Sequence, residues 1–295
     1  MNNQELLAQL NTLHSQGKLI GRFSSIPNEI YHHSDCPGIS ATKLGLISRS
    51  IKHYLHALDN NKSSEAMAFG SAFHDSILLP NLFRDQYILG IDIDKRSKAN
   101  KELWEKFIET NKDKTILLQN DFDRIHAMND VVKESQACSY LLSSGEAEVT
   151  FFWVDELTGI LCKCRVDWLF ERDGRYIIAD FKTTRDSSRK KFQKTIVDFS
   201  YDRTAAFYCD GVSKCLDTFI NTFALIAIES EAPYEMNLYC LGKESMNTGR
   251  LLYRSALQKY KEYLDNKNIV VERSQSKEFE EIDIPAWATL IENRS

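Results

Sequence analysis

The chain has 295 residues, 43% of them hydrophobic, which is enough for a substantial core in one large domain. Its formal net charge of −5 excludes a strongly basic protein, so a nucleic-acid site would have to come from a local cluster of basic residues. Its seven cysteines contain no CxxC pair, which argues against a disulfide framework, a zinc ribbon or an iron–sulfur cluster and favours a cytoplasmic location.

The first half of the chain predicts helices. Leucines recur at helical spacing near the N-terminus and no basic start precedes an apolar block, so this segment is expected to be an amphipathic helix and not a signal peptide. Pro80 is expected to end one helix, and the charged segment 85–97 to form a loop. The helices predicted in this half span residues 38–59, 63–79, 98–111 and 119–143.

The hydrophobic period changes after residue 145. Three stretches rich in β-branched and aromatic residues, 146–155, 159–171 and 175–184, are separated by the turn sequences ELT and RDG, so they predict three sequential antiparallel strands. A helix at 198–214, strands at 222–229 and 234–241, and a long helix at 243–265 are expected to follow. The longest apolar run is too short to cross a membrane. This order predicts an α/β or α+β fold, in which helices flank a central mixed β-sheet with an antiparallel meander.

The third predicted strand carries an acid and a base two residues apart. Side chains i and i+2 lie on the same face of a strand, so Asp180 and Lys182 project together while Phe181 points the other way. A hairpin places Asp167 beside Asp180, and Glu148 lies on the strand before that. Carboxylates this close repel each other unless a cation lies among them, and hard oxygen ligands suit Mg²⁺ or Mn²⁺. The pattern predicts metal-dependent phosphodiester hydrolysis, in which Lys182 orients or deprotonates a water molecule or stabilises developing charge.

The alternative for the D-x-K tripeptide is an Asp–Lys ladder on a solvated surface. Two features favour the metal site. The apolar run YIIA precedes Asp180, so this carboxylate should be partly buried, and a second acid arrives at hairpin distance in CRVDW.

Several short motifs, in this order, resemble the PD-(D/E)xK nuclease superfamily, and within it the RecE-type (exodeoxyribonuclease VIII-like) exonucleases of phages and prophages. They are G-x-x-x-H with Gly70 and His74 in FGSAFHDSILLP, the acid of CRVDW, the D-x-K of IIADFKTTRD, and a helix that carries Tyr208. The similarity runs from about residue 30 to residue 245, and the block 146–211 is its specific part.

The resemblance implies roles for these residues. It implies a metal ion held by His74, Asp167, Asp180 and the main-chain carbonyl of Phe181, with Lys182 as the catalytic partner of the water. It assigns Glu148 to the acid of an E-x-x-x-F-W motif, where it would support the site or bind a second metal ion. The catalytic set that it implies is Asp167, Asp180, Lys182, Glu148 and Tyr208.

Two positions depart from the family pattern. Val166 stands where the family usually has Pro, and Thr204 stands where the Gln of a Q-x-x-x-Y motif is expected. Because Thr lacks the amide of Gln, an alternative stays open in which the chain is a catalytically weak DNA-binding or regulatory protein with the nuclease fold. A structure-specific endonuclease with a four-cysteine cluster is disfavoured, because the chain has no such cluster.

A basic run follows the D-x-K strand. Residues 182–194 contain six basic residues and one acid, so they form either a solvated loop or a binding site for DNA phosphates. Lys163 and Arg165 share the strand face of Asp167 and are expected to point toward the same patch. The predicted DNA contacts are Lys163, Arg165, Thr183, Arg185, Arg189, Lys190 and Lys191.

The combined expectation is a Mg²⁺-dependent (or Mn²⁺-dependent) deoxyribonuclease. No phosphate-binding G-x-x-x-x-G-K-[ST] motif occurs, so it should act without ATP. From the resemblance come 5′→3′ exonuclease action on double-stranded DNA ends in phage-type recombination, a ring-shaped homo-oligomer and a single-strand annealing protein as partner. We expect an N-terminal helical segment packed on the core at 1–60, a nuclease core at 61–270 and a tail at 271–295.

Overall fold

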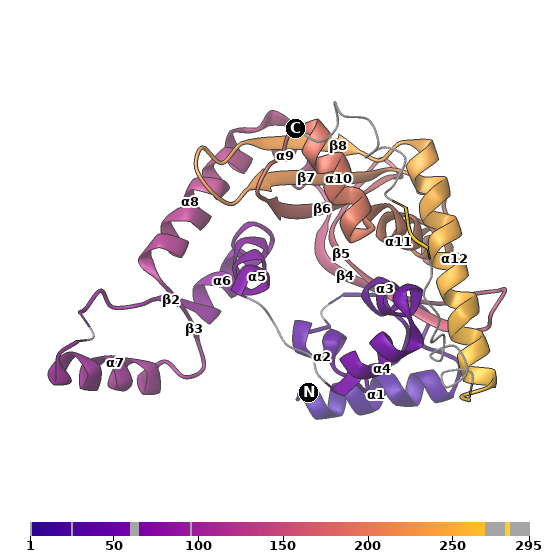
Figure 1. The fold of residues 1–295 in the computed structure, drawn as a ribbon, viewed down its shortest axis with the longest axis horizontal. Helices are drawn as coiled ribbons and strands as arrows, with labels where there is room; N and C mark the ends of the chain where they lie inside the picture. The colour runs from indigo at the N-terminus through magenta and orange to yellow at the C-terminus, as the bar shows by residue number, and fades with distance from the viewer. Residues whose placement is uncertain (1, 25, 60–64, 95, 269–280, 284–295) are drawn as a thin grey trace.

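A six-stranded mixed β-sheet forms the centre of the computed structural model, which describes residues 2–24, 26–59, 65–94, 96–268 and 281–283 (Figure 1). The order is β1-β4-β5-β6-β7-β8, and every neighbouring pair is antiparallel except β6 and β7, which are parallel. The predicted fold class is therefore confirmed. The strands are β1 (Gly21–Phe23), β4 (Glu146–Val154), β5 (Leu161–Arg172), β6 (Arg175–Thr184), β7 (Phe223–Glu229) and β8 (Met236–Cys240).

Helices cover both faces of this sheet. One hydrophobic cluster packs α3, α11 and α12 on one face, and a second packs α5, α8 and α9 on the other (Figure 1). A third cluster joins α1 and α2 to β4. The helices are α1 (Asn3–Ser15), α2 (Asn28–His32), α3 (Ala41–Arg49), α4 (Ile51–Asp59), α5 (Glu65–Leu78), α6 (Pro80–Gln86), α7 (Lys98–Thr110), α8 (Gln119–Glu134), α9 (Gln136–Leu142), α10 (Arg189–Phe199), α11 (Tyr201–Leu216) and α12 (Lys243–Asp265). None of the helices in the described ranges has both the length and the apolar character that a membrane span requires.

Serine residues divide two of the predicted helices. Ser50 has an extended backbone (φ −171°), and its Oγ accepts a hydrogen bond from the main-chain N–H of His53, so α3 ends there and α4 begins. Ser135 caps the start of α9 by accepting from Cys138 N–H. The expectation of continuous helices at 38–59 and 119–143 was therefore wrong at these points, because serine side chains compete for backbone groups and favour helix starts.

The basic run after β6 is also organised differently from a loop. It enters α10 at Arg189, and α10 is separated from α11 by Ser200, whose φ of 52° lies in the left-handed region. The start predicted at residue 198 was wrong, because the periodic pattern does not reveal this break between two helices. Three of the basic residues thus lie in the first turn of a helix.

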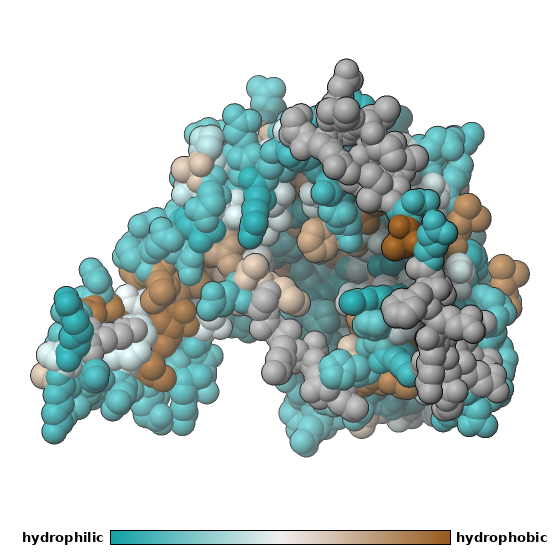
Figure 2. Space-filling view, viewed as in Figure 1, coloured by the Kyte–Doolittle hydropathy of each residue, from teal (hydrophilic) through white to brown (hydrophobic). Residues whose placement is uncertain are grey.

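Residues 87–117 form an arm that extends from the rest of the protein (Figure 1). It consists of α7 between β2 (Tyr87–Leu89) and β3 (Thr115–Leu117), two short strands that pair in parallel. The segment 85–97 was expected to be a loop, and β2 corrects this in part. Figure 2 shows hydrophobic side chains gathered where the arm meets the body. The base of the arm is anchored by apolar contacts, because Tyr87 and Leu117 pack in the cluster of α5 and α8.

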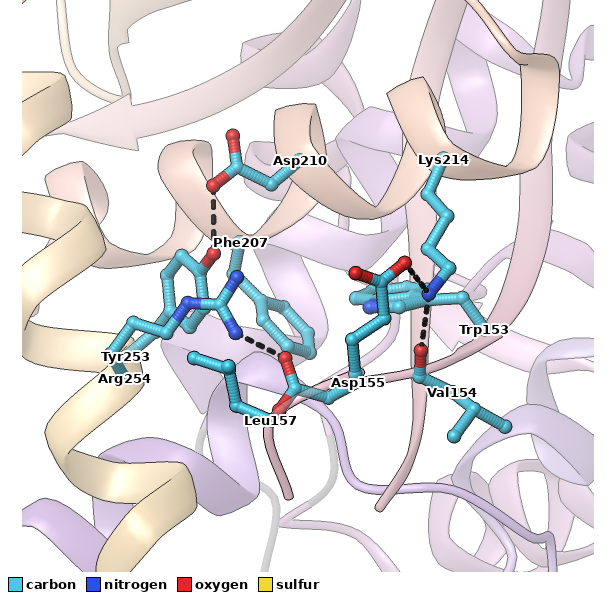
Figure 3. Close-up of a pocket in the computed structure, with 10 residues that line it drawn as sticks. Trp153, Val154, Asp155, Leu157, Phe207, Asp210, Lys214, Tyr253 and Arg254 are labelled. Carbon is cyan, nitrogen blue, oxygen red and sulfur yellow. Dashed lines mark hydrogen bonds and ion pairs between the residues drawn. The ribbon is translucent and has the colours of Figure 1, made fainter. Parts of the chain in front are cut away.

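Both hairpin turns lie where the sequence indicated. Asp173 and Gly174 connect β5 to β6 with φ of 51° and 72°, and positive φ at both positions is what a two-residue hairpin turn requires. The β4–β5 turn is held by Asp155, which accepts from the Thr158 N–H and hydroxyl and pairs with Arg254 of α12 (Figure 3). The pocket beside it, about 290 Å³, is lined by charged residues that are held in ion pairs, so we assign it a structural role.

The N-terminal segment, predicted at residues 1–60, contributes a strand to the sheet and a helix to the core. Its β1 pairs with β4, and its α3 packs in the cluster of α11 and α12. Of the predicted tail at 271–295, only residues 281–283 lie within the described part of the chain. The seven cysteines are all free thiols.

Helix α12 approaches α11 closely at Gly249. A Cβ atom at this position would overlap the main-chain oxygen of Asp202 in α11. Gly249→Ala should therefore lower the free energy of unfolding by about 1–3 kcal/mol, because the two helices have to separate. Chemical denaturation measures this loss, and Gly242→Ala, whose added methyl meets open space, should show a smaller one. Equal losses in the two variants would contradict the packing argument.

Candidate active site

One face of helix α5 packs against β6. Residues four apart share a helix face, which explains the G-x-x-x-H spacing. A Cβ on Gly70 would lie 3.6 Å from the Oγ1 of Thr183, and one turn later the Nε2 of His74 donates to the main-chain oxygen of Phe181 at 2.6 Å. Two of the predicted metal ligands, the imidazole of His74 and this carbonyl, are thus in direct contact.

Glu148 and Asp167 face each other across β4 and β5, because the pairs on either side keep one register. The normal alternation of side chains is interrupted here. Val166 packs in the α11 cluster and Trp168 in the α5 cluster, although residues two apart in a strand usually share a face. Glu148 also has a positive φ of 55°, which is costly for a residue other than glycine. The irregularity brings ligand atoms of His74, Glu148 and Asp167 within 4.8 Å of one another.

The third carboxylate comes from β6. The β5–β6 ladder ends at the pair Trp168–Ala179, so the next position places Asp167 beside Asp180. There Asp167 Oδ2 accepts a hydrogen bond from the main-chain N–H of Phe181 at 3.0 Å. The buried carboxyl groups of Asp167 and Asp180 interact closely enough for the charge of Asp167 to raise the pKa of Asp180, so the pair favours holding one proton between the two groups. Asp167 lies in the middle of β5.

Lys182 projects with Asp180, and its Nζ lies 2.6 Å from Asp180 Oδ2. Burial and the charge of Asp167 raise the pKa of Asp180 to about 7, and they outweigh the opposite effect of Lys182. Burial alone would lower the pKa of Lys182, but the charges of Asp180 and Asp167 raise it above its usual value. Lys182 is therefore a cation at neutral pH.

The donor set fits a divalent cation. Burial and the charge of Lys182 lower the pKa of His74, so its imidazole is neutral. With the Nε2 proton donated to Phe181, the lone pair of His74 Nδ1 lies 3.4 Å from Asp167 Oδ2. Two electron-rich atoms thus face each other, beside two carboxyl groups that share one proton. A divalent cation relieves both conflicts, and a set rich in oxygen suits Mg²⁺ or Mn²⁺.

Arg165 neutralises Glu148 at the edge of this cluster. The Arg165 Nε lies 2.6 Å from Glu148 Oε2, and its guanidinium also contacts Asn28 and lies over the Tyr31 ring, 5.0 Å from the centroid. Burial raises the pKa of Glu148, although the charge of Arg165 opposes this. Arg165 therefore lies at the site as predicted, but its charge is already shared with a carboxylate.

Lys163 was predicted to contact DNA, and this was wrong. Its side chain is buried, with only 2% of the residue exposed, and its Nζ donates to the main-chain oxygens of Tyr31 and Cys36 at 2.8 and 3.2 Å. Alternation along β5 predicts which face a residue occupies, but it does not predict what covers that face. Here the segment around α2 covers it.

Of the remaining predicted DNA contacts, the basic residues lie at the surface and Thr183 lies against a helix. Arg185, Arg189, Lys190 and Lys191 are exposed, the last three in the first turn of α10. Thr183 lies against Gly70 of α5, and so does not share the side of β6 that Lys182 occupies.

The helix expected to carry Q-x-x-x-Y is α11. Tyr208 lies against the α11 cluster, where burial raises the pKa of its hydroxyl well above the usual value and the charges of Asp180 and Asp167 add to the effect. Thr204 Oγ1 donates to the main-chain oxygen of Ser200 one turn earlier, at 3.4 Å. The hydroxyl of Thr204 is thus used within its own helix.

Two residues near the site were missed. The Nζ of Lys182 lies 5.1 Å from the centroid of the Tyr201 ring, and no sequence signal indicated this because it depends on the break at Ser200. Asp75 follows His74 on α5, accepts a hydrogen bond from the Tyr87 hydroxyl at 2.7 Å, and its charge acts on Glu148. Its position next to His74 was the signal that could have identified it.

The pKa of Asp180 predicts how metal binding depends on pH. Because its folded-state value is raised above 3.8 to about 7, the metal-free protein should lose stability as pH rises through this interval. A divalent cation displaces the shared proton, so it should raise the melting temperature more at about pH 8 than at about pH 6. Thermal melts with Mn²⁺ measure the difference. Asp180→Asn should remove it, and an equal stabilisation by Mn²⁺ at both pH values would contradict the shared-proton interpretation.

Comparisons with known proteins identify the family and a protein of similar fold. A family described as "PDDEXK-like domain of unknown function (DUF3799)" matches residues 40–276. A crystal structure from Eubacterium rectale, described as a "Putative exonuclease", matches with a TM-score of 0.56 and 12% identity over 91% of this chain and 99% of that one, which shows a shared fold. A structure described as SSO0001 matches with a TM-score of 0.33 and 12% identity over 90% of this chain and 88% of that one, a level that supports no conclusion. No curated protein matches.

The family match covers most of the chain and confirms the resemblance to the PD-(D/E)xK superfamily that the motifs indicated. It includes the whole cluster from His74 to Lys182. The chain therefore belongs to the PDDEXK-like domain family of unknown function (DUF3799).

Proposed function

We propose that this protein is a metal-dependent nuclease that hydrolyses DNA phosphodiesters. The observation that carries the proposal is the convergence of His74, Asp167, Asp180 and the Phe181 carbonyl beside the cationic Lys182. A divalent cation held by these groups would polarise the scissile phosphate and make a water molecule more acidic.

The residues of the chain then have distinct roles. Asp167 and Asp180 supply anionic oxygens, and the hydrogen bond from Phe181 N–H fixes the orientation of Asp167. Lys182 is a cation beside the two carboxylates, so it is placed to donate to phosphate oxygens and to stabilise the charge that develops on them. Arg165 orients Glu148 against the cluster.

The start of α10 favours an anionic polymer as the substrate. Its first turn contains three basic residues and no acid, opposite to the usual preference at a helix N-terminus, where the macrodipole is positive. In the described part of the chain, none of the exposed cations of this run forms an ion pair. A DNA backbone supplies the missing negative charge. These cations are Arg185, Arg189, Lys190, Lys191 and Lys194.

The proposal extends to the finer points of the resemblance. We propose an ATP-independent, Mg²⁺-dependent exonuclease of the RecE type that acts 5′→3′ on double-stranded DNA ends in the cytoplasm during phage-type recombination. The description of the Eubacterium rectale protein as an exonuclease supports this on the basis of fold. A ring-shaped homo-oligomer and a single-strand annealing protein as partner belong to the same proposal.

Two DNA substrates test the function. Linear duplex and covalently closed circular duplex are incubated with the protein and Mg²⁺, with EDTA and Asp180→Asn as controls. An exonuclease degrades only the linear duplex, an endonuclease also opens the circle, and both controls should be inactive. Binding of both substrates without cleavage would overturn the proposal and favour the alternative of a catalytically weak DNA-binding protein, for which Thr204 is the supporting observation.

Charge reversal on α10 tests DNA binding. Replacement of Arg189, Lys190 and Lys191 by Glu should weaken binding and flatten its salt dependence, by about 0.9 in the logarithmic slope for each phosphate contact that is lost. Fluorescence anisotropy over a series of salt concentrations measures this slope. The same reversal at the exposed lysines 112, 114 and 133 controls for net charge. An unchanged slope in the α10 variant would assign this run to the solvated surface.

A further inference from the structure

A row of aromatic rings runs from the edge strand β8 to the surface beside Lys182. The ring of Tyr239 in β8 stacks on Phe192 of α10, with centroids 5.3 Å apart and an interplanar angle of 16°. Phe192 contacts Tyr201 at 6.3 Å, and Tyr201 stacks on Phe199 at 5.7 Å and 19°. Lys182 Nζ lies over the ring of Tyr201, so the row passes directly by the candidate active site.

The row ends at an exposed ring. Phe192 and Phe199 lie seven residues apart, on nearly the same face of α10, but Phe192 is 1% exposed and Phe199 is 65% exposed. The difference arises because α10 ends at Phe199 and the left-handed Ser200 turns the chain into α11. A single exposed apolar side chain is common on a protein surface. Phe199 differs because its ring is already stacked on Tyr201, whose own ring contacts Lys182.

The surroundings of Phe199 are those of a nucleic-acid surface. Its helix begins with Arg189, Lys190 and Lys191, and Lys194 follows, all of them exposed. A polyanion that follows these cations would pass along α10 to the ring. Proteins that hold single-stranded DNA combine such a positive surface with an aromatic ring on which a base stacks.

We propose that Phe199, supported by Tyr201, stacks against an unpaired base of the DNA next to the phosphate that is cleaved. This deepens the proposed function and rests on it. To lie on the ring of Phe199, this base has to unstack from the neighbouring base of its own strand. The enzyme therefore engages a strand end that is frayed or single-stranded at this nucleotide. Phe199 is then a specificity-determining residue, and it takes no part in the chemistry at Asp180 and Lys182.

The experiment uses a base analogue whose emission falls when it stacks. Linear duplexes carry 2-aminopurine at one of the last three nucleotides of either strand, and Ca²⁺ replaces Mg²⁺ so that the strand is held uncut, which a gel verifies. We compare the wild type with Phe199→Leu, Phe199→Trp and Phe219→Ala. Leucine keeps an apolar side chain without an aromatic face, and tryptophan restores the face. Phe219 is a second exposed ring (79%), beyond the far end of α11.

The wild type should change the emission of 2-aminopurine at one of these positions, and Phe199→Leu should lose this change. Phe199→Leu should also lower kcat/KM on duplex ends by about 5- to 150-fold, the range reported by alanine substitution for loss of one stacked base. Phe199→Trp should restore both properties, and Phe219→Ala should behave as wild type.

The results separate this inference from the proposed function. If the wild type cleaves DNA but Phe199→Leu keeps the emission change, or loses no more activity than Phe219→Ala, the stacking role is refuted and the nuclease function stands. If the wild type neither binds nor cleaves DNA, both are refuted. Loss of activity that Phe199→Trp does not restore would show a packing role in α10 and would also overturn the inference.

Discussion

Replacement of Lys182 by alanine should lower cleavage by about 10²–10⁴-fold and leave metal binding intact or tighter. The rate falls because the ammonium group that stabilises charge on the phosphate has been removed. Metal binding persists because Asp167, Asp180 and His74 are unchanged, and it can tighten because a cation 2.6 Å from Asp180 no longer competes with the metal ion. A gel assay measures cleavage, and calorimetry with Mn²⁺ measures binding.

The partner variant is Asp180→Asn, which should lose both cleavage and metal binding. Asn is similar in size to Asp, so the comparison isolates the negative charge that the cation requires. The two variants should also differ in stability without metal. Asp180→Asn removes a buried acid that shares a proton with Asp167, and Lys182→Ala leaves that acid without its counter-ion. If both variants bind Mn²⁺ like the wild type and still cleave DNA, the pair is only a salt bridge and the nuclease proposal fails.

Replacement of His74 by alanine should have the second large effect on metal binding and cleavage. It should weaken Mn²⁺ binding by about 10-fold or more, since even residues that only orient metal ligands contribute a factor of 10–100 to metal affinity. The change removes the one nitrogen donor of the cluster and the hydrogen bond that ties α5 to the Phe181 carbonyl. Cleavage should fall with it, and a raised Mn²⁺ concentration should recover part of the activity.

His14→Ala is the matched control, because His14 is exposed on α1. It should bind Mn²⁺ and cleave DNA as the wild type does. Melting curves without metal show whether His74→Ala is folded. Wild-type Mn²⁺ affinity in a folded His74→Ala protein would mean that the metal ion is held by the carboxylates alone, and that α5 has only a packing role at the site.

Much of the sheet could be predicted because its signals are local. Side chains alternate with a period of two in a strand, so Asp180 and Lys182 had to share one side of β6, with Ala179 and Phe181 buried on the other. The Asp173–Gly174 turn favours a two-residue hairpin, and this turn sets the register that brings Asp167 to Asp180. Residues close in sequence carry all of this information.

The same local rule failed where distant segments meet. Alternation placed Lys163 on the face of Arg165, but α2, which is more than a hundred residues away in sequence, covers Lys163 and satisfies its amino group. The shift in alternation at Glu148 and Asp167 could not be derived either. A positive φ at Glu148 costs energy locally, so it is maintained by packing on both sides of the sheet.

The sequence by itself determined the strand order from β4 to β6, the turn between β5 and β6, and the pairing of an acid with a base on one side of a strand. Only the tertiary structure decided which groups complete the site: the contact of His74 with the Phe181 carbonyl, the pairing of Glu148 with Arg165, and the ring of Tyr201 over Lys182. The physical reason is the distance along the chain over which each kind of interaction acts. Periodicity and turn propensity act over a few residues, whereas burial and charge pairing depend on which remote segment packs against each face.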